Sequence, residues 1–248
     1  MKQYFNVNLE FDKTKVDKII QSTIANKGKG YVCSIESNNL TIANTNPAFL
    51  NVVNNALVNI CDGSNIARIL GRIHKQNLTS YIGADLFTKY VSLCRYKQYF
   101  LGNTDEVLAG LRTNLSMVDP TIEDMPFIGL PFRTVENFDY QEIAHRINEY
   151  SPDIIWVSLG APKQEEFMFR LLPYIDRGVM FGFGAIFNFN AGGAGQVKRA
   201  PNWMLKLKLE WLYRAFEEPK KNIPRYAKFI KILPRLINDE YNRIKEKK

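Results

Sequence analysis

Hydrophobic and polar positions follow two different periods along most of this chain. Short apolar runs, many of them ending at glycine or aspartate, are separated by stretches with helical spacing. Alternating strands and helices are typical of βαβ units, so we predict an α/β fold class with a Rossmann-like parallel sheet. The strand candidates are residues 56–60, 80–82, 99–101, 126–128, 154–159 and 179–183.

The first 50 residues predict a small α+β lead-in before this sheet. Residues 5–11 alternate apolar and polar side chains, as in a half-buried strand. Residues 16–24 have apolar positions at helical spacing, and the glycines Gly28 and Gly30 follow them. Two more short strands, residues 31–35 and 39–43, are expected on either side of a turn.

From Pro201 onward the pattern becomes wholly helical. Pro201 suits a first helical turn, and apolar residues between 204 and 216 cover more than half of the helix circumference. A second helix is expected to begin near Pro224 and to be kinked at Pro234. We therefore divide the chain into an α/β domain, residues 1–200, and a helical C-terminal appendage, residues 201–248.

The positive charge of the chain is concentrated in this appendage. The formal net charge is +8, and residues 219–248 hold ten Lys or Arg against three Asp or Glu. A nearly neutral body with a basic tail indicates an anionic partner: a membrane surface, a nucleic acid or a diphosphate. Bulky apolar residues at helical spacing between the cations favour the anionic membrane surface, and a nucleic-acid-binding module is the alternative.

Nothing in the sequence predicts secretion or a membrane span. No stretch reaches the roughly 20 apolar residues that cross a bilayer, and the N-terminus lacks the apolar core of a signal peptide. Cys33, Cys61 and Cys94 are far apart and form no CxxC pair, so we expect reduced thiols without a disulfide framework. The chain is expected to be cytoplasmic or peripheral to a membrane.

The first segment that could carry chemistry surrounds Asp62. Asp62 follows an apolar strand, where its carboxylate would project into the ligand crevice and could act as a general base toward an acceptor hydroxyl. Asn44 and Asn46 could bind sugar hydroxyls or phosphate from a neighbouring loop. The alternative is structural: Asp62 would cap the next helix, and the asparagines would form turns.

The second segment joins a strand to a helix at Gly160. A glycine turn that leads into a helix N-terminus is a natural anion site, Lys163 adds charge, and the Gln164 amide could bind a base or a sugar. An ordinary βα turn is the alternative. A nucleotide-dependent oxidoreductase would also have a parallel sheet, but its GxGxxG fingerprint is missing here.

The third segment is rich in glycine and ends in two cations. Glycines 182, 184, 192, 193 and 195 surround aromatic residues, and Lys198 and Arg199 follow. Such a loop could close over phosphates, although it could equally be a flexible connector.

Together these segments resemble the WecG/TagA/CpsF family of bacterial glycosyltransferases. The resemblance rests on GAPKQE, the glycine-aromatic stretch that runs to KRAP, and the LEWLYRAFEEPKK ending, in the same order. It implies an α/β fold with a helical appendage, and a UDP-sugar donor of the N-acetylmannosamine or glucose type. It also implies a polyprenyl-diphosphate-linked acceptor at the inner face of the plasma membrane, inversion at the anomeric carbon, and a place in cell-surface polysaccharide or teichoic acid synthesis.

The resemblance also assigns roles to individual residues. Asp62 would be the catalytic base, and Arg214, Lys221 and Arg225 match cationic positions that reach the active site. The chain departs from the family pattern at two positions expected near substrate: Asn44 stands where threonine is common, and Ser80 where arginine is common. The sequence contains no DxD pair, so we predict a metal-independent reaction without a cofactor. Homo-oligomer formation is left open.

Overall fold

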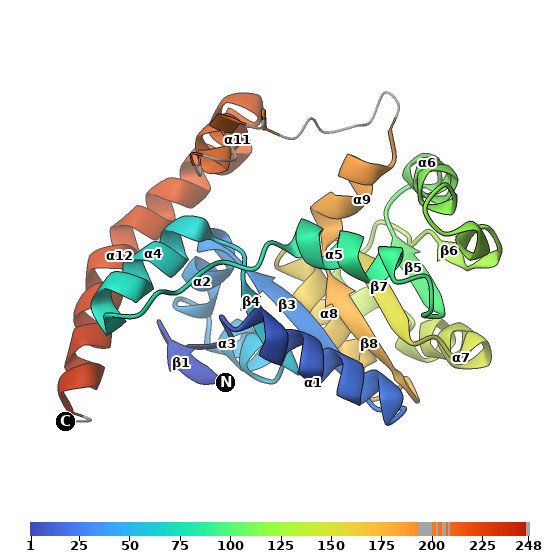
Figure 1. Cartoon of the computed structure of the whole chain (residues 1–248), viewed down its shortest axis with the longest axis horizontal. Coiled ribbons are helices and arrows are strands. Elements are labelled where there is room, and N and C mark those ends of the chain that lie inside the picture. Colours follow the sequence, from blue (N-terminus) through green and yellow to red (C-terminus); the bar gives the residue numbers. More distant parts are fainter. Residues whose placement is uncertain (193–199, 202, 205–206, 208, 247–248) are drawn as a thin grey trace.

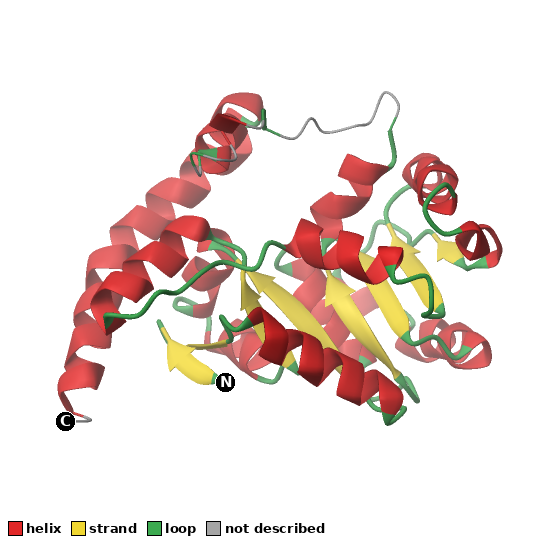
Figure 2. Ribbon diagram, in the orientation of Figure 1, coloured by secondary structure: helices red, strands yellow, loops and turns green. Residues whose placement is uncertain are grey.

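The computed structural model describes residues 1–192, 200–201, 203–204, 207 and 209–246. At its centre is a six-stranded sheet in the order β4-β3-β8-β7-β5-β6, and every pair in it is parallel (Figure 2). Parallel strands are covered on both faces, which explains why their sequences are continuously apolar. The strands are β3 (Lys29–Ile35), β4 (Val58–Cys61), β5 (Gln98–Gly102), β6 (Phe127–Ile128), β7 (Ile154–Ser158) and β8 (Gly178–Gly182).

Helices cover the two faces of the sheet and bury a separate apolar cluster on each. The first face carries α2 (Ser37–Ala43), α3 (Pro47–Asn54), α4 (Ser64–His74), α7 (Tyr140–Tyr150), α8 (Lys163–Leu171) and α12 (Pro219–Glu246). The second face carries α1 (Lys13–Ala25), α5 (Gly83–Ser92), α6 (Asp105–Ser116) and α9 (Gly184–Asn190). Smaller elements are β1 (Lys2–Tyr4), β2 (Val7–Leu9), η1 (Pro120–Asp124), η2 (Val135–Asn137) and α11 (Glu210–Glu217).

The path of the chain creates a crevice at the carboxyl ends of the central strands. The helices that follow β3 and β7 pack on the first face, whereas α9, which follows β8 between them, packs on the second face. Neighbouring strands whose helices leave in opposite directions form a topological switch point, where α/β sheets bind ligands. The expected α/β fold is confirmed, and the switch point lies on both sides of β8.

Three details of the predicted strands are wrong. Residues 31–35 are a strand, as predicted, but they belong to β3 of the main sheet and not to a separate lead-in, so only the β1-β2 hairpin and α1 precede that sheet. Residues 39–43 belong to α2, because Leu40 and Ala43 lie one turn apart and both face the first cluster. Residues 80–82 form no strand but lead directly into α5.

The C-terminal appendage is attached to the body more extensively than its sequence suggested. The predicted start near Pro224 is wrong, because one helix, α12, runs from Pro219 and contains both Pro224 and Pro234. Each proline removes one backbone donor and its ring crowds the carbonyl of residue i−4, so the kink at Pro234 stays a prediction. Phe229 and Leu236 join the first apolar cluster, and Figure 1 shows α12 running beside α4. Over the part of the chain that the structure describes, no helix is long and apolar enough to cross a membrane.

Candidate functional site

Asp62 lies directly after β4, at the carboxyl edge of the sheet. Ser34 Oγ, near the end of neighbouring β3, donates a hydrogen bond of 2.7 Å to Asp62 Oδ2, and the Asp62 amide donates to Ile35 O at 3.0 Å. The N-cap residue of α4 is Gly63, the residue after Asp62. Burial, together with the adjacent Asp62 charge, raises the pKa of Cys61 to about 12 and keeps this thiol neutral. The structure therefore holds one oriented carboxylate at this edge.

The N-terminus of α5 reaches the same place. A Cβ atom added to Gly83, the first residue of α5, would lie 3.4 Å from Ser34 Oγ. The first N–H groups of a helix carry partial positive charge, which favours an anion or a developing oxyanion beside them. Ser80, just before α5, lies 3.1 Å from Ser64 at the start of α4. The serine that replaces the family's common arginine is thus close to the Asp62 loop.

Two glycine turns meet at the ends of β8 and β7, two and three strands away from β4 and its carboxylate. Gly160, after β7, has a φ of +75° and open space where a side chain would project. A Cβ atom on Gly184, after β8, would come within 2.8 Å of the Gly160 nitrogen, so the two turns touch and Gly184 must lack a side chain. The turns after β7 and β8 together form a backbone-lined surface that a phosphate could approach.

The buried Gln164 side chain joins the start of α8 to the end of β8 and to the turn that follows it. Its side chain is 5% exposed; Nε2 donates to Gly182 O at 2.7 Å, and Oε1 accepts from the Gly184 amide at 3.0 Å. These contacts give Gln164 a supporting role in the site, and a direct contact with base or sugar stays a prediction.

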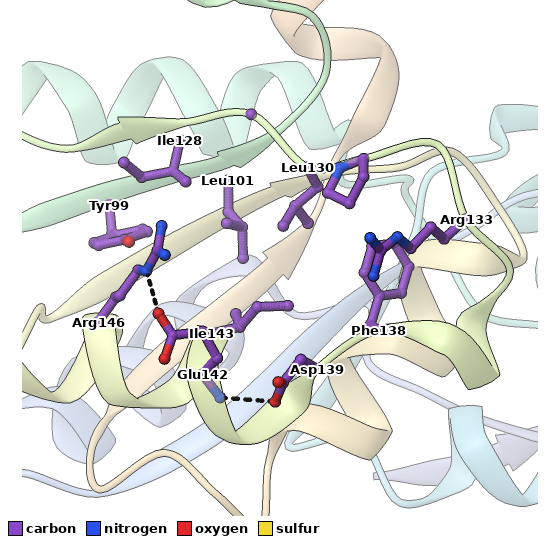
Figure 3. A pocket seen from close by; sticks show the side chains of 12 residues that line it. Tyr99, Leu101, Ile128, Leu130, Arg133, Phe138, Asp139, Glu142, Ile143 and Arg146 are labelled. Atoms are coloured by element: carbon purple, nitrogen blue, oxygen red, sulfur yellow. Dashed lines mark hydrogen bonds and ion pairs between the residues drawn. The ribbon is translucent and has the colours of Figure 1, made fainter.

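Lys163 faces a different part of the molecule. Its ammonium lies 5.3 Å from the ring centre of Phe132 and 5.0 Å from that of Phe138, in the segment that precedes α7. Phe138 also lines a cleft of about 180 Å³ between the ends of β5 and β6 and the start of α7 (Figure 3). Lys163 therefore connects the Gly160 turn to this cleft.

The sequence interpretation did not include this cleft. Its floor is apolar, and charged side chains from the loop after β6 and from α7 surround it (Figure 3). Tyr99 and Leu101 line the cleft from the first face of the sheet. Ile60 packs on the second face, and alternation along β4 directs Asp62, two residues later, to that second face as well. The signal was the run from Gly129 to Arg133 directly after a strand. The lining residues that Figure 3 labels are Tyr99, Leu101, Ile128, Leu130, Arg133, Phe138, Asp139, Glu142, Ile143 and Arg146.

Asn44 and Asn46 both have structural hydrogen bonds. Asn44 Nδ2 donates to Phe5 O and Leu40 O, and Asn44 Oδ1 accepts from Asn6, so this side chain ties α2 to the β1-β2 turn. Asn46 is the N-cap of α3 and accepts from the amides of residues 48 and 49. The structural alternative describes both side chains as they lie here, and their contact with substrate stays a prediction.

The cations of the appendage lie in different surroundings. Arg214 of α11 lies 4.6 Å from the ring centre of Phe189, near the C-terminal end of α9, the helix that leaves β8. Lys221 pairs with Glu218 at 2.9 Å, and Arg225 is half-buried on α12. Arg199 and its neighbour in the third segment lie outside the described residues.

Exposed apolar side chains accompany these cations. They are spaced along α11, the preceding segment and the first half of α12, whereas the second half of α12 is packed on the body. In the described part of the chain, no group of three His, Cys, Asp or Glu side chains could hold a metal ion. The exposed apolar residues are Trp203, Leu207, Trp211, Phe216, Ile223 and Ile230.

Comparison with known proteins decides the family. The sequence matches the Glycosyl transferase WecG/TagA/CpsF family over residues 4–246, nearly its whole length. The chain belongs to this family. It is therefore a glycosyltransferase, in agreement with the resemblance found in its motifs and against the oxidoreductase alternative.

Two curated relatives have the same printed name, N-acetylglucosaminyldiphosphoundecaprenol N-acetyl-beta-D-mannosaminyltransferase. The protein of Staphylococcus aureus (strain MW2) is 28% identical over 229 residues, which cover 87% of this chain and 85% of the relative. The protein of Bacillus subtilis (strain 168) is 30% identical over 168 residues, which cover 64% of this chain and 62% of the relative. Both are thus similar to this WecG/TagA/CpsF glycosyltransferase over more than half of its length.

Proposed function

We propose that this glycosyltransferase moves N-acetylmannosamine from its UDP conjugate to an N-acetylglucosamine carried on a polyprenyl diphosphate, with inversion. The donor sugar and the acceptor follow the printed name of the S. aureus and B. subtilis relatives. Such a transfer belongs to the synthesis of a cell-surface polymer of the teichoic acid class. A UDP-glucose donor is the competing choice within the same reaction class.

The Asp62–Ser34 pair, next to the switch point at β8, is the observation that best supports this reaction. A β-linked product from an α-linked UDP-sugar requires a single displacement with inversion at the anomeric carbon. Such a displacement needs one base, which takes the proton of the acceptor hydroxyl as its oxygen attacks. Asp62 is that base, and the 2.7 Å bond from Ser34 orients its carboxylate.

The leaving diphosphate lies over the turns at Gly160 and Gly184. Strands in a sheet are about 4.8 Å apart, so the β7 turn is roughly 14 Å from the end of β4, where Asp62 lies. This span accommodates a sugar and a diphosphate in line. The backbone amides of the turns and the cations of the appendage, including Arg214, Lys221 and Arg225, stabilise the charge that develops on the departing diphosphate.

The appendage brings the enzyme to its lipid-linked acceptor. Exposed apolar residues from Trp203 to Ile230, with basic residues between them, suit a peripheral position on an anionic membrane surface. An acceptor anchored in the inner face of the plasma membrane would then present its sugar to Asp62. This arrangement joins membrane binding to transfer.

A two-step experiment tests the proposed function. A thermal-shift screen of UDP-sugars identifies the donor, and transfer is then measured to a short-chain polyprenyl-diphosphate N-acetylglucosamine. We expect UDP-N-acetylmannosamine to stabilise the protein and to give a β-linked disaccharide. Transfer only from UDP-glucose would change the donor assignment, and the absence of transfer from any UDP-sugar would contradict the proposal.

A further inference from the structure

Glu165 is a carboxyl group enclosed completely within the protein. It lies in the first turn of α8, next to Gln164, and is 0% exposed. Asn39 of α2, which is 1% exposed, donates from Nδ2 to Glu165 Oε1 at 3.0 Å. Gln164 Nε2 donates to the same oxygen at 3.1 Å. Two amide side chains therefore converge on one carboxyl oxygen beneath the Gly160 and Gly184 turns.

The second carboxyl oxygen of Glu165, Oε2, and the side-chain oxygen of Asn39, Oδ1, are both buried and lack a hydrogen bond within the described residues. Both are acceptors if Glu165 is ionised, so neither can satisfy the other. Native proteins leave few such atoms, and each one calls for a physical explanation. A single proton on Glu165 Oε2 provides this explanation. A carboxylic acid and a primary amide can form a cyclic pair with one N–H···O and one O–H···O bond.

The surroundings of Glu165 favour this proton. Burial raises the pKa of Glu165 to about 7, and it outweighs the hydrogen bonds from Gln164 and Asn39, which lower this pKa; the nearby Glu36 charge also raises it. The Cys33 thiol of β3 is neutral, because burial and the proximity of Glu165 raise its pKa. The neighbouring elements α3, β7 and β8 contain no ionisable side chain, while Glu136 of η2 and Arg170 of α8 act on Glu166 instead.

We propose that Glu165 is held as a neutral carboxylic acid that donates to Asn39 Oδ1, and that this acid–amide pair is a positioning device for the glycine turns. The pair connects α2, which follows β3, to α8, which follows β7. Glu165 Oε1 accepts from Gln164 Nε2 and so fixes the orientation of the Gln164 amide. In this orientation Gln164 Nε2 also donates to Gly182 O, and Gln164 Oε1 accepts from the Gly184 amide. In the proposed function, on which this role rests, those turns bind the donor diphosphate. Glu165 itself touches no substrate.

Ionisation of Glu165 would weaken this arrangement. The proton that joins it to Asn39 would be lost, and a buried negative charge would compete for the Gln164 amide. The carboxyl group has a higher pKa in the folded chain than its ordinary value of 4.5, so the folded state binds more protons than the unfolded state between these values. Stability therefore falls as the pH rises toward and through about 7. At one unit above its pKa, only about a tenth of the neutral form remains.

The decisive variant is Glu165→Gln, whose amide supplies the same donor and acceptor without a titrating proton. Glu166→Gln, the same change on the next residue, is the matched control. Infrared spectroscopy of the wild type at pH 6 should show the carbonyl band of a protonated carboxyl that Glu165→Gln lacks and Glu166→Gln keeps. The melting temperature of the wild type should fall more steeply between about pH 5 and pH 8 than that of Glu165→Gln.

Amide hydrogen exchange at Gly184 tests the positioning role without any substrate. At pH 8, after correction for intrinsic exchange, this amide should exchange several-fold faster in the wild type and in Glu166→Gln than in Glu165→Gln. With a UDP-sugar donor, Glu165→Gln should keep kcat and remove the rise in KM above pH 7.

The outcomes separate this proposal from the proposed function. A wild type without the protonated band, or with the same pH dependence of melting as Glu165→Gln, overturns the acid–amide pair. Equal Gly184 exchange in all three proteins at pH 8 overturns the positioning role. If the band and the exchange difference are found but no UDP-sugar is transferred, the pair stands and the proposed function fails.

Discussion

Ser34 Oγ donates to Asp62 Oδ2 across the ends of two neighbouring strands, at 2.7 Å. Asp62 is also held through its backbone, because its amide donates to Ile35 O. These two bonds contribute to the position and the direction of the carboxylate. The helix that begins at Gly83 places its N-terminus against the same serine. A reacting hydroxyl in this corner would meet an oriented acceptor on one side and partial positive charge on the other.

Asp62→Asn should separate catalysis from binding. The amide has nearly the same shape but cannot accept the proton of the acceptor hydroxyl, so turnover should fall by about 10²–10⁴-fold. The affinity for UDP, measured by calorimetry, should change little. Full turnover in a folded Asp62→Asn protein would remove this residue from the mechanism.

Ser34→Ala provides a graded comparison. This variant keeps the carboxylate and removes one hydrogen bond that orients it, a contribution of about 1.5 kcal/mol, the lower value for a partly buried bond to a charged acceptor. The corresponding loss in kcat is about tenfold, below that of Asp62→Asn. A loss as large as that of Asp62→Asn would mean that Ser34 takes part in proton transfer itself.

A second prediction concerns the attachment of α12. Glu240 is 1% exposed and accepts from three sides: from His74 Nε2 at 2.9 Å, the Phe5 amide at 2.8 Å and Arg243 Nη1 at 3.1 Å. Glu240→Ala leaves the Phe5 amide and His74 Nε2 buried without this acceptor, whereas Arg243 keeps its bond to Asn6, so the free energy of unfolding should fall by about 3 kcal/mol. Denaturant unfolding measures this change.

Glu149→Ala is the matched control for that experiment. Glu149 also pairs with a histidine, His145, but at 3.7 Å and with both side chains about two-thirds exposed. Exposed pairs of this kind contribute at most about 1 kcal/mol. Equal losses in the two variants would show that Glu240 does not anchor the helix.

The sequence allowed most of the alternation of strands and helices, and the position of Asp62 at a strand end, to be predicted, because both depend on local patterns. An apolar run that ends at Asp62-Gly63 predicts a strand end wherever the strand lies in the sheet. The attachment of α12 depends on Glu240 meeting His74 across 166 positions, and no local period contains that information. The role of Gln164 was hidden for the same reason, since its partners, Gly182 and Gly184, belong to the next strand and turn.

The packing of α12 changes how membrane binding is best tested. Deleting residues 219–248 would remove Phe229, Leu236 and Glu240 from the core, and the protein would lose stability as well as its appendage. Phe216→Ser with Ile223→Ser removes two exposed apolar side chains and leaves that packing intact. Binding to anionic vesicles should weaken at least tenfold, since each buried apolar side chain contributes about 1.5–3 kcal/mol.

The control variant is Met117→Ser, which alters an exposed apolar residue at the end of α6, away from the appendage. Vesicle binding should be unchanged in Met117→Ser and should weaken with salt in the wild type, because each Lys or Arg near the surface contributes roughly 1 kcal/mol that salt screens. If the Phe216 and Ile223 substitutions leave vesicle binding unchanged, the contact surface lies elsewhere.

The last prediction concerns the charge on the leaving diphosphate. Many glycosyltransferases neutralise it with a divalent ion held by a DxD pair, a pattern missing from this sequence. Arginine can replace much of a metal's role, because its guanidinium donates paired hydrogen bonds to phosphate oxygens. Arg214 is suitably placed: it stacks on Phe189 of α9, the helix that leaves the β8 turn. Transfer should therefore survive excess EDTA.

Variants in the same assay test the cations. Arg214→Ala and Arg225→Ala should lose turnover by more than they lose stability, whereas Lys231→Ala, farther along α12, should keep both. Arg214→Lys should restore little activity, because an ammonium cannot form the paired hydrogen bonds of a guanidinium. Activity that EDTA abolishes and Mg²⁺ or Mn²⁺ restores would contradict this account. The carboxylates of the cleft at Asp139 and Glu142 would then be the first to test as metal ligands, because they already lie on one wall of a cavity near Lys163.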